Sequence, residues 1–365
     1  MLKDQAVRVV GAMSGTSLDG VDAAEIVTDG HKVLEFGESV FLPYNGTQRA
    51  TLKAALGKWH GDDVADVSEL IETVHAQVLS GFTNADLVGF HGQTLAHDPK
   101  GRGTHQAGDG AVLAEVLGKS VVWDFRSADV QMGGEGAPLA PFYHFALAKK
   151  MKAVEPIAML NLGGVGNVTW IDPGLPHPDS EGALLAFDTG PANAPINDVM
   201  QARFGLAFDE DGKIAAKGTV DEEIIDTFLK HPFFFQIPPK SLDRDAFVGL
   251  CEAVEPLADV DAIATLTMAC AASVAHGLVA CPSPPSQILV TGGGRRNPTL
   301  MKMLAERCGV PVALIEDAGF DGDMLEAQAF AFLAVRVAKG LPTSAPGTTA
   351  VAAPVGGGTL SRPSA

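Results

Sequence analysis

Short apolar runs separated by a glycine-rich loop open this chain. The run at residues 7–10 predicts a buried strand, and residues 21–27, with Val21, Ala23 and Val27 on one face, predict a second strand. The loop at residues 11–20 therefore joins two strands, whereas the glycine-rich loop of a P-loop or dinucleotide-binding protein leads into a helix.

Strand and helix patterns alternate along the rest of the chain. Further strands are expected at residues 86–90, 121–123, 157–162, 168–171 and 288–290. Helical patterns cover residues 48–58, 64–80, 110–117, 259–279, 298–307 and 323–339. This alternation predicts an α/β protein.

An internal duplication is indicated by a second strand–glycine loop–strand unit at residues 157–171. A length of 365 residues suits two domains, each opening with such a unit. We expect an N-terminal domain at residues 1–155, a C-terminal domain at residues 156–342 and a Pro/Gly/Ser-rich tail at residues 343–365.

The composition narrows the range of partners. A formal net charge of −18 argues against a nucleic-acid binder and against docking on anionic lipid. The four cysteines form no CxxC pair, which favours reduced thiols over a metal site. The N-terminus lacks the apolar region of a signal peptide, and no stretch approaches the ~20 apolar residues of a membrane span. We therefore expect a cytoplasmic protein with no membrane partner.

Two glycine-rich loops are candidates for binding a nucleotide. The loop Ser14-Gly15-Thr16-Ser17-Leu18-Asp19-Gly20 offers close backbone approach, hydroxyl donors and carboxylates, which suits a phosphate site, although an ordinary hairpin turn would have the same residues. Gly292-Gly293-Gly294, followed by Asn297, would let adenosine lie on bare backbone. A tight strand–helix connection is the alternative there.

Two positions at predicted strand ends carry charge. Asp188, in Phe187-Asp188-Thr189-Gly190-Pro191, is either a base or the N-cap of a helix. Arg126 stands near Asp129 and would either hold a substrate oxygen through its paired donors or form a structural salt bridge.

Three further polar residues are candidates, with either a functional or a structural interpretation. Gln93 is a candidate partner for a sugar hydroxyl. His91, at the end of a predicted strand, is more typical of a buried polar residue with a partner. Glu326 opens an apolar helix, where the helix dipole favours negative charge. Together with the glycine loops, these residues suggest a nucleotide cleft between duplicated domains.

Taken together, these motifs resemble the anhydro-N-acetylmuramic acid kinases. The resemblance extends in order from about Val9 to Pro342. The matching stretches are Met13–Asp22, His91-Gly92-Gln93-Thr94, Asp124-Phe125-Arg126 through Asp129, Gly136-Ala137-Pro138-Leu139, Asn161-Leu162-Gly163-Gly164, Phe187–Pro191, Pro239-Lys240-Ser241, Gly292–Gly294 with Asn297, and Asp323 with Glu326-Ala327.

The resemblance implies a fold and a reaction. The fold would be two duplicated actin/hexokinase-like (ribonuclease H-like) domains with an inter-domain cleft for ATP and Mg²⁺. The enzyme would hydrolyse the anhydro bridge of 1,6-anhydro-N-acetylmuramic acid and phosphorylate the freed oxygen during peptidoglycan recycling. The products would be N-acetylmuramic acid 6-phosphate and ADP, and the protein would be a homodimer.

The resemblance also implies roles for individual residues. Asp188 would be the catalytic base, and Glu326 would assist by polarising the water or a sugar hydroxyl. The residues expected around the sugar are His91, Gln93, Arg126, Asp129, Asp188 and Glu326. The residues expected around ATP are Gly15, Thr16, Ser17, Leu18, Asp19, Gly20, Val21, Asp22, Gly163, Gly164, Gly292, Gly293, Gly294 and Asn297. Mg²⁺ would be held by the phosphates and by water near Asp19 or Asp22.

The chain departs from the family pattern at a few positions. These are Leu242, Asp243, Pro195, Asn197 and Ala350. An actin- or Hsp70-like ATPase module is the alternative, because it would share the glycine loops without needing the residues around a sugar. A dinucleotide-dependent reductase ranks lower, since Gly163-Gly164-Val165-Gly166 leads into a strand and not into a helix.

Overall fold

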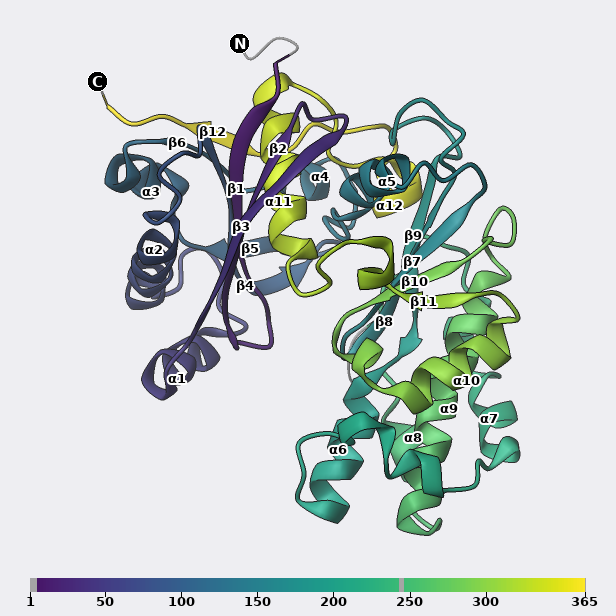
Figure 1. Ribbon diagram of the computed structural model, residues 1–365. Coiled ribbons are helices and arrows are strands. Elements are labelled where there is room, and N and C mark those ends of the chain that lie inside the picture. The colour runs from purple at the N-terminus through teal and green to yellow at the C-terminus, as the bar shows by residue number, and fades with distance from the viewer. Residues whose placement is uncertain (1–4, 243–245, 365) are drawn as a thin grey trace. The chain divides into compact units, whose positions relative to one another are not determined.

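The computed structural model describes residues 5–242 and 246–364, which form two compact units (Figure 1). The first unit contains the chain through Lys152, the short segment His177–Ser180 and the chain from Met324 onward. The second unit contains Ala153–Pro176 and Glu181–Asp323. The two units are described separately below.

The first unit is built on a mixed sheet. Within the described residues its strands follow the order β12-β6-β4-β1-β2-β3, and β5 pairs with β4. β1, β2 and β3 form an antiparallel meander, while β1, β4 and β6 run parallel. The strands are β1 (Val7–Ser14), β2 (Gly20–Thr28), β3 (Val33–Pro43), β4 (Leu87–Asp98), β5 (Gly103–Ala107), β6 (Ser120–Trp123) and β12 (Thr359–Ser361).

Helices cover both faces of this sheet. α2 places Val67, Ile71, Val74 and Val78 at helical spacing against the sheet residues Val10, Val88 and Val121, which forms one core. The helices of the unit are α1 (Gly46–Ala55), α2 (Ala65–Leu79), α3 (Gly110–Leu117), α4 (Ser127–Gln131), α5 (Pro141–Lys150), α11 (Leu325–Lys339) and α12 (Pro346–Thr349).

Two glycines let α11 lie against the opposite face of the sheet, where the yellow helix crosses the purple strands in Figure 1. A Cβ on Gly11 of β1 would overlap the carbonyl oxygen of Ala327, and a Cβ on Gly89 of β4 would overlap that of Phe330. The helix backbone therefore approaches the strand backbone more closely than any side chain allows.

The second unit repeats the strand order of the first. Its sheet follows the order β11-β10-β7-β8-β9, in which β7, β8 and β9 are an antiparallel meander and β7, β10 and β11 are parallel. The same order, β6-β4-β1-β2-β3, runs through the first sheet, which supports the predicted internal duplication. The strands are β7 (Ile157–Leu162), β8 (Val165–Ile171), β9 (Leu184–Pro191), β10 (Ile288–Thr291) and β11 (Val312–Leu314).

The core of the second unit is centred on α9. This helix has the length and apolar composition of a membrane span, contrary to the expectation that no stretch of the chain would, but 78% of its most apolar 18 residues are buried inside the unit. It is the core helix of a globular unit. The helices are α6 (Asn193–Phe204), α7 (Glu222–Phe228), α8 (Val248–Ala253), α9 (Asp259–Leu278) and α10 (Pro298–Cys308), with short 3-10 turns η1 (Glu210–Gly212), η2 (Ala215–Lys217), η3 (Pro232–Phe235), η4 (Gly293–Arg296) and η5 (Ile315–Ala318).

The predicted domain limits differ from these units. The first boundary falls after Lys152, near the predicted residue 155, but α11 and the chain at 343–364 belong to the first unit and not to the C-terminal domain or a separate tail. The reason is packing: α11 lies on the first sheet, and β12 pairs antiparallel with β6. The segment at residues 343–364 is therefore part of a folded unit.

The predicted strand ends were too early in two places. β4 continues through His91 and Gln93 to Asp98, because β5 pairs with its second half. β9 continues past Asp188 to Pro191, and α6 begins only at Asn193, so Asp188 lies inside a strand and is not a helix N-cap.

Candidate active site

The predicted site residues of the first unit gather at one edge of its sheet. β1 ends at Ser14, the parallel pairing of β4 with β1 ends at Gln93, and Asp124–Arg126 follow β6. Ser14 and Gln93 are register partners, and the Ser14 hydroxyl donates to Oε1 of Gln93 at 2.5 Å. The carboxyl ends of parallel strands are where α/β proteins bind ligands.

The loop between β1 and β2 presents backbone and hydroxyls to solvent. Thr16, Ser17 and Asp19 are exposed, while the side chains of Leu18 and Val21 are buried in the core. Leu18 has a φ of 58° and its N–H donates to the carbonyl of Gly15 at 3.1 Å, which makes a tight turn. Left-handed backbone at a non-glycine residue costs energy and tends to occur at functional sites. Leu18 and Val21 can therefore contact a ligand only through backbone atoms.

His91 and Arg126 form one hydrogen-bonded pair. The Nε group of Arg126 donates to Nε2 of His91 at 3.0 Å, and its Nη1 donates to the carbonyl of Gly136 at 2.8 Å. Because a guanidinium can only donate, His91 Nε2 accepts, so the proton is on Nδ1 and bonds the Gly92 carbonyl at 2.9 Å. Burial, reinforced by Arg126, lowers the pKa of His91 well below its ordinary value. His91 is therefore neutral and accepts a hydrogen bond from the Arg126 cation.

Phe330 and Glu326 bring α11 to this pair. The Phe330 ring lies 4.4 Å from the His91 ring, centroid to centroid, and 6.0 Å from the Arg126 guanidinium carbon. Glu326 lies one helical turn before Phe330 and keeps solvent access, although protein atoms surround it closely. That surrounding raises the pKa of Glu326, while the charge of Arg126 acts to lower it. Burial lowers the pKa of Arg126 to about 10, so it remains a cation at neutral pH.

Asp129 and Gln93, both predicted to contact the sugar, lie in the interior. Asp129 is 1% exposed; its Oδ1 accepts from the N–H of Gly136 at 2.7 Å, and its Oδ2 accepts from the hydroxyls of Ser344 and Thr349. Gln93 is fully buried under Ser14. Asp129 thus holds the segments at Gly136 and at residues 344–349, and Gln93 holds Ser14.

The glycine loops of the second unit also meet at one sheet edge. Gly163 and Gly164 form the turn between β7 and β8, and their carbonyls accept from the backbone N–H groups of residues 192–194 at 2.9–3.1 Å. Gly292 has a φ of 75°, and a Cβ there would collide with Asn161 and Leu162 of β7. The Gly292–Gly294 loop therefore packs directly on the end of β7.

Ionic and capping contacts hold this second loop in place. Arg295 is 7% exposed and donates to Glu316, Asp323 and the carbonyl of Gly292, each at 2.8–2.9 Å. Asn297 caps α10, since its Oδ1 accepts from the N–H of Leu300 at 3.0 Å. The strand–helix connection is tight, as the alternative interpretation required, and Gly293 is still exposed.

Asp188 is held from two sides within the second unit. Its Oδ1 accepts from Nδ2 of Asn167 at 3.0 Å, and its Oδ2 accepts from the N–H of Leu242 at 2.8 Å. Its own N–H donates to the carbonyl of Lys240 at 2.9 Å. Burial raises the pKa of this half-buried carboxyl, while the bonds from Asn167 and Leu242 act to lower it. The group is a fixed carboxylate with lone pairs left on both oxygens.

The departures from the family pattern have local explanations. Pro195 and Asn197 do not interrupt α6, because Pro195 stands in the first turn, where a backbone N–H has no intrahelical acceptor. Leu242 contributes through its backbone, so its side chain is not constrained by Asp188. Ala350 ends α12 with a φ of 59°, the conformation that favours glycine. Asp243 lies outside the described residues.

Two residues that contact the candidate site residues, Asn167 and Phe330, were not predicted from the sequence. Asn167 falls between the strands predicted at residues 157–162 and 168–171, but it lies inside β8 and opposite Asp188. Its position directly before the predicted strand at residues 168–171 was the available signal that it belongs to that strand. Phe330 follows Glu326 by four positions, the spacing that brings helical side chains together.

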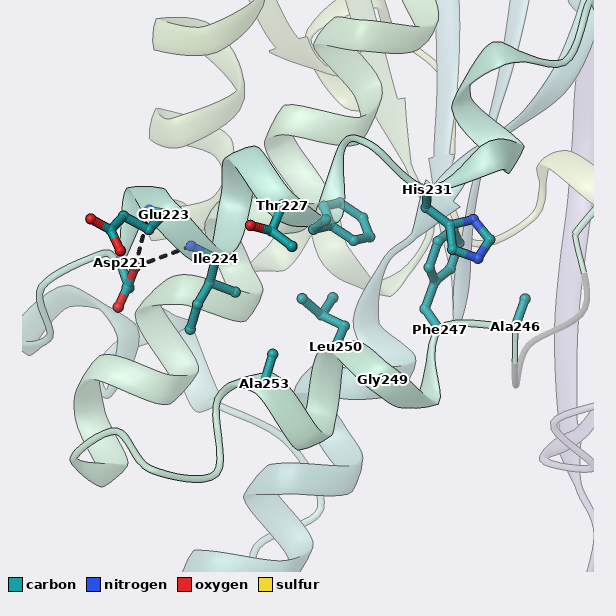
Figure 2. Close-up of a pocket in the computed structure, with 11 residues that line it drawn as sticks. Asp221, Glu223, Ile224, Thr227, His231, Ala246, Phe247, Gly249, Leu250 and Ala253 are labelled. Atoms are coloured by element: carbon teal, nitrogen blue, oxygen red, sulfur yellow. Dashed lines mark hydrogen bonds between the residues drawn. The ribbon is translucent and has the colours of Figure 1, made fainter.

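The second unit contains a cavity of about 540 Å³ (Figure 2). It is bounded by α7 and α8, with His231, Phe247 and Thr227 on its wall, and none of the residues predicted for catalysis or binding lines it. Among the described residues, no group of three or more His, Cys, Asp or Glu side chains is arranged to hold a metal ion.

The fold resembles that of one solved kinase structure. A gluconate kinase from Lactobacillus acidophilus superposes with a TM-score of 0.50 at 11% identity, covering 99% of this chain and 94% of that one. At that identity the likeness speaks for the fold alone, and it agrees with the expected actin/hexokinase-like class with two duplicated domains.

Sequence comparison defines the family. The model of the family described as anhydro-N-acetylmuramic acid kinase matches residues 7–361, and the chain belongs to this family. An anhydro-N-acetylmuramic acid kinase from Cereibacter sphaeroides is 62% identical, covering 100% of this chain and 99% of that protein. One from Roseobacter denitrificans is 59% identical, covering 99% and 96%. The predictions of family and of a kinase are confirmed.

Proposed function

We propose that this chain converts 1,6-anhydro-N-acetylmuramic acid, water and ATP into N-acetylmuramic acid 6-phosphate and ADP. The observation that carries the proposal is the Asp188 carboxylate, fixed by two donors and not neutralised by an ion pair with either of them. Such a group suits proton removal from water. Family membership supplies the substrate class.

Besides one proton transfer, the reaction makes two bonds and breaks two. The oxygen of water bonds to the anomeric carbon of the sugar as the bond from that carbon to O6 breaks, and the water proton passes to Asp188. O6 accepts the γ-phosphoryl group as the bond to the β-phosphate oxygen breaks, and ADP leaves. Attack by water opposite a leaving sugar oxygen resembles inverting glycoside hydrolysis, in which a carboxylate acts as the base.

In the proposed sugar site Arg126 and Glu326 act on the substrate. Arg126 is a cation whose remaining donors can hold a carboxylate such as the lactyl group of a muramic acid. His91 and Phe330 fix its position. Glu326, which keeps solvent access, would orient a sugar hydroxyl or the reacting water. Asp129 and Gln93 would support these residues from the interior.

In the proposed nucleotide site the glycine loops act through backbone. In the first unit, residues 15–22 would bind phosphate oxygens. In the second unit, Gly163 and Gly164 have the bare backbone that phosphate binding needs, and Gly292–Gly294 with Asn297 would border the adenosine. The exposed carboxylate of Asp19 and the carboxylate of Asp22 have the oxygen chemistry to hold Mg²⁺ through water. When bound, Mg²⁺ neutralises charge on the phosphates.

The biological setting is part of the same proposal. We place the reaction in peptidoglycan recycling in the cytoplasm, and we expect a homodimer, which light scattering coupled to gel filtration would measure. These points rest on the family resemblance.

The test is ADP release from Mg²⁺ and ATP, with and without 1,6-anhydro-N-acetylmuramic acid. The expected result is sugar-dependent release together with a product whose mass is that of the 6-phosphorylated, ring-opened sugar. ADP release that ignores the sugar would favour an actin- or Hsp70-like ATPase module instead. Nucleotide binding without release would point to a different acceptor.

A further inference from the structure

Asn167 stands where it can control the orientation of Asp188. The two residues are register partners on β8 and β9, so their side chains leave the same face of the sheet. A register shift between Gly166 and Asn167 marks a bulge at this point. Bulges re-aim side chains and release backbone groups from the strand ladder.

The backbone N–H of Asp188 has a partner outside the sheet. Its N–H donates to the carbonyl of Lys240, and the N–H of Leu242 returns to the carboxylate, so the segment at 240–242 contacts Asp188 twice. Lys240 is itself held, since its ammonium donates to the carbonyl of Phe233 at 2.9 Å. One side of the carboxylate is thus fixed by backbone, and Asn167 fixes the other side.

The chemistry of Asn167 suits this place. Both oxygens of an aspartate accept, so the amide must present its NH₂ end, and the observed 3.0 Å contact uses that end. An amide donor favours the ionised carboxylate without adding a charge, whereas a lysine would form an ion pair that weakens the base. A second carboxylate at this distance would instead share a proton with Asp188.

We propose that Asn167 is a positioning residue that orients the Asp188 carboxylate and keeps it ionised for catalysis. This inference rests on the proposed role of Asp188 as the base. The bond from Asn167 is one of the causes that lower the pKa of Asp188 against the effect of burial. Removing the bond therefore shifts the acid limb of activity to higher pH.

The experiment compares Asn167→Leu, which has the same branching at Cγ and no donor, with Asn167→Asp and with the wild type. A matched control is Val168→Ala, on the same strand, because Val168 is fully buried in the core on the opposite face and its truncation weakens packing without reaching Asp188. For each protein, kcat and KM are measured across pH, and folding is checked by thermal unfolding and ATP binding.

The expected result for Asn167→Leu is a fall in kcat of about 10-fold, because losing one hydrogen bond to a charged group typically costs the free energy that corresponds to such a factor. The KM for ATP should stay within about twofold of the wild-type value. The acid limb moves to higher pH in both Asn167 variants and stays in place in Val168→Ala. A merely structural role would move the unfolding temperature of all three variants and leave every pH profile unchanged, which would overturn the proposal.

A second readout does not depend on turnover. The Asp188 carboxyl resonance, assigned from its loss in Asp188→Asn, is titrated by carbon-detected NMR in the wild type and in Asn167→Leu. A higher pKa in the variant supports the positioning role even if the wild type fails to turn over the sugar, in which case only the proposed function is lost. An unchanged pKa refutes it. If Asn167→Leu does not fold, the same titration on Asn167→Asp decides.

Discussion

Gly11→Ala would push α11 away from the sheet of the first unit. The added Cβ would overlap the carbonyl oxygen of Ala327 and the amide nitrogen of Ala331, and would lie 3.0 Å from the Cα of Ala331, whereas ordinary contacts lie at 3.4–4 Å. All three are backbone atoms, so no rotamer change relieves the overlap. The helix must move by about 1 Å, and a gap of that size forfeits a quarter to a half of each dispersion contact.

The cost follows from what α11 buries. Most of its residues are buried, including Phe332, Leu333 and Arg336. Overpacking typically costs about 1–3 kcal/mol, and a backbone clash belongs at the upper end, about 3 kcal/mol. At about 2–4 °C per kcal/mol, the unfolding temperature should fall by roughly 6–12 °C.

The assay is thermal unfolding followed by circular dichroism, with Gly46→Ala as the matched control. Gly46 is exposed at the start of α1, and a Cβ there meets nothing within 4 Å, so the same substitution should be neutral or stabilise by about 0.4–1 kcal/mol. If Gly11→Ala unfolds within about 1 °C of the wild type while the control behaves as expected, the close packing of α11 on β1 is refuted.

Three further changes test the site and the fold. Asp188→Asn should lower kcat about 10²–10⁴-fold with ATP affinity intact by calorimetry, and near-normal turnover would remove Asp188 as the base. Because burial raises the pKa of Asp188, the folded wild type binds a proton more readily than the unfolded chain. Wild-type stability should therefore fall, relative to that of Asp188→Asn, as pH rises from the ordinary aspartate pKa through the raised one; a flat difference in unfolding temperature contradicts this. Ala350→Gly should raise the free energy of unfolding by about 0.5–1 kcal/mol in a denaturant titration, because this exposed residue has a φ of 59°; a decrease would show that the alanine methyl group contributes more than the strain costs. Arg126→Lys loses the Nε donor to His91, and the KM for the sugar should rise about 10-fold with the KM for ATP unchanged; an unchanged sugar KM would place the sugar elsewhere.

The sequence predicted those parts of the fold whose signal is local. Apolar runs gave β1, β7 and β10, and an Ala-rich helical pattern gave α9 within a residue of its observed end. β3 was missed because most of its residues are exposed although many are apolar, so it lacks the apolar/polar alternation of a half-buried strand. Its pairing with β2 is decided by tertiary contact, which a single sequence does not display.

The assignment of α11 shows the same limit at longer range. Its position in the chain suggested the C-terminal domain, while its packing partners, Gly11 and Gly89, are more than 200 residues earlier. A glycine in a strand can be interpreted as a site of close backbone approach only when the backbone segment that packs against it is known. Likewise, Asp129 looked like a ligand residue because its partners Ser344 and Thr349 are far away in sequence.

The path of the chain through the first unit has a consequence for biosynthesis. The nascent chain completes β1 to β6 before it enters the second unit at Ala153. α11, which covers the first sheet, and β12, which pairs with its edge, are synthesised only after Asp323. At about 5–20 residues per second, the ribosome takes roughly 10–35 s to synthesise the intervening segment. Throughout that interval the sheet face that receives α11 is uncovered and apolar, whereas the second unit can fold as soon as it emerges. Chaperone dependence should therefore be greatest for the unit that begins first and finishes last.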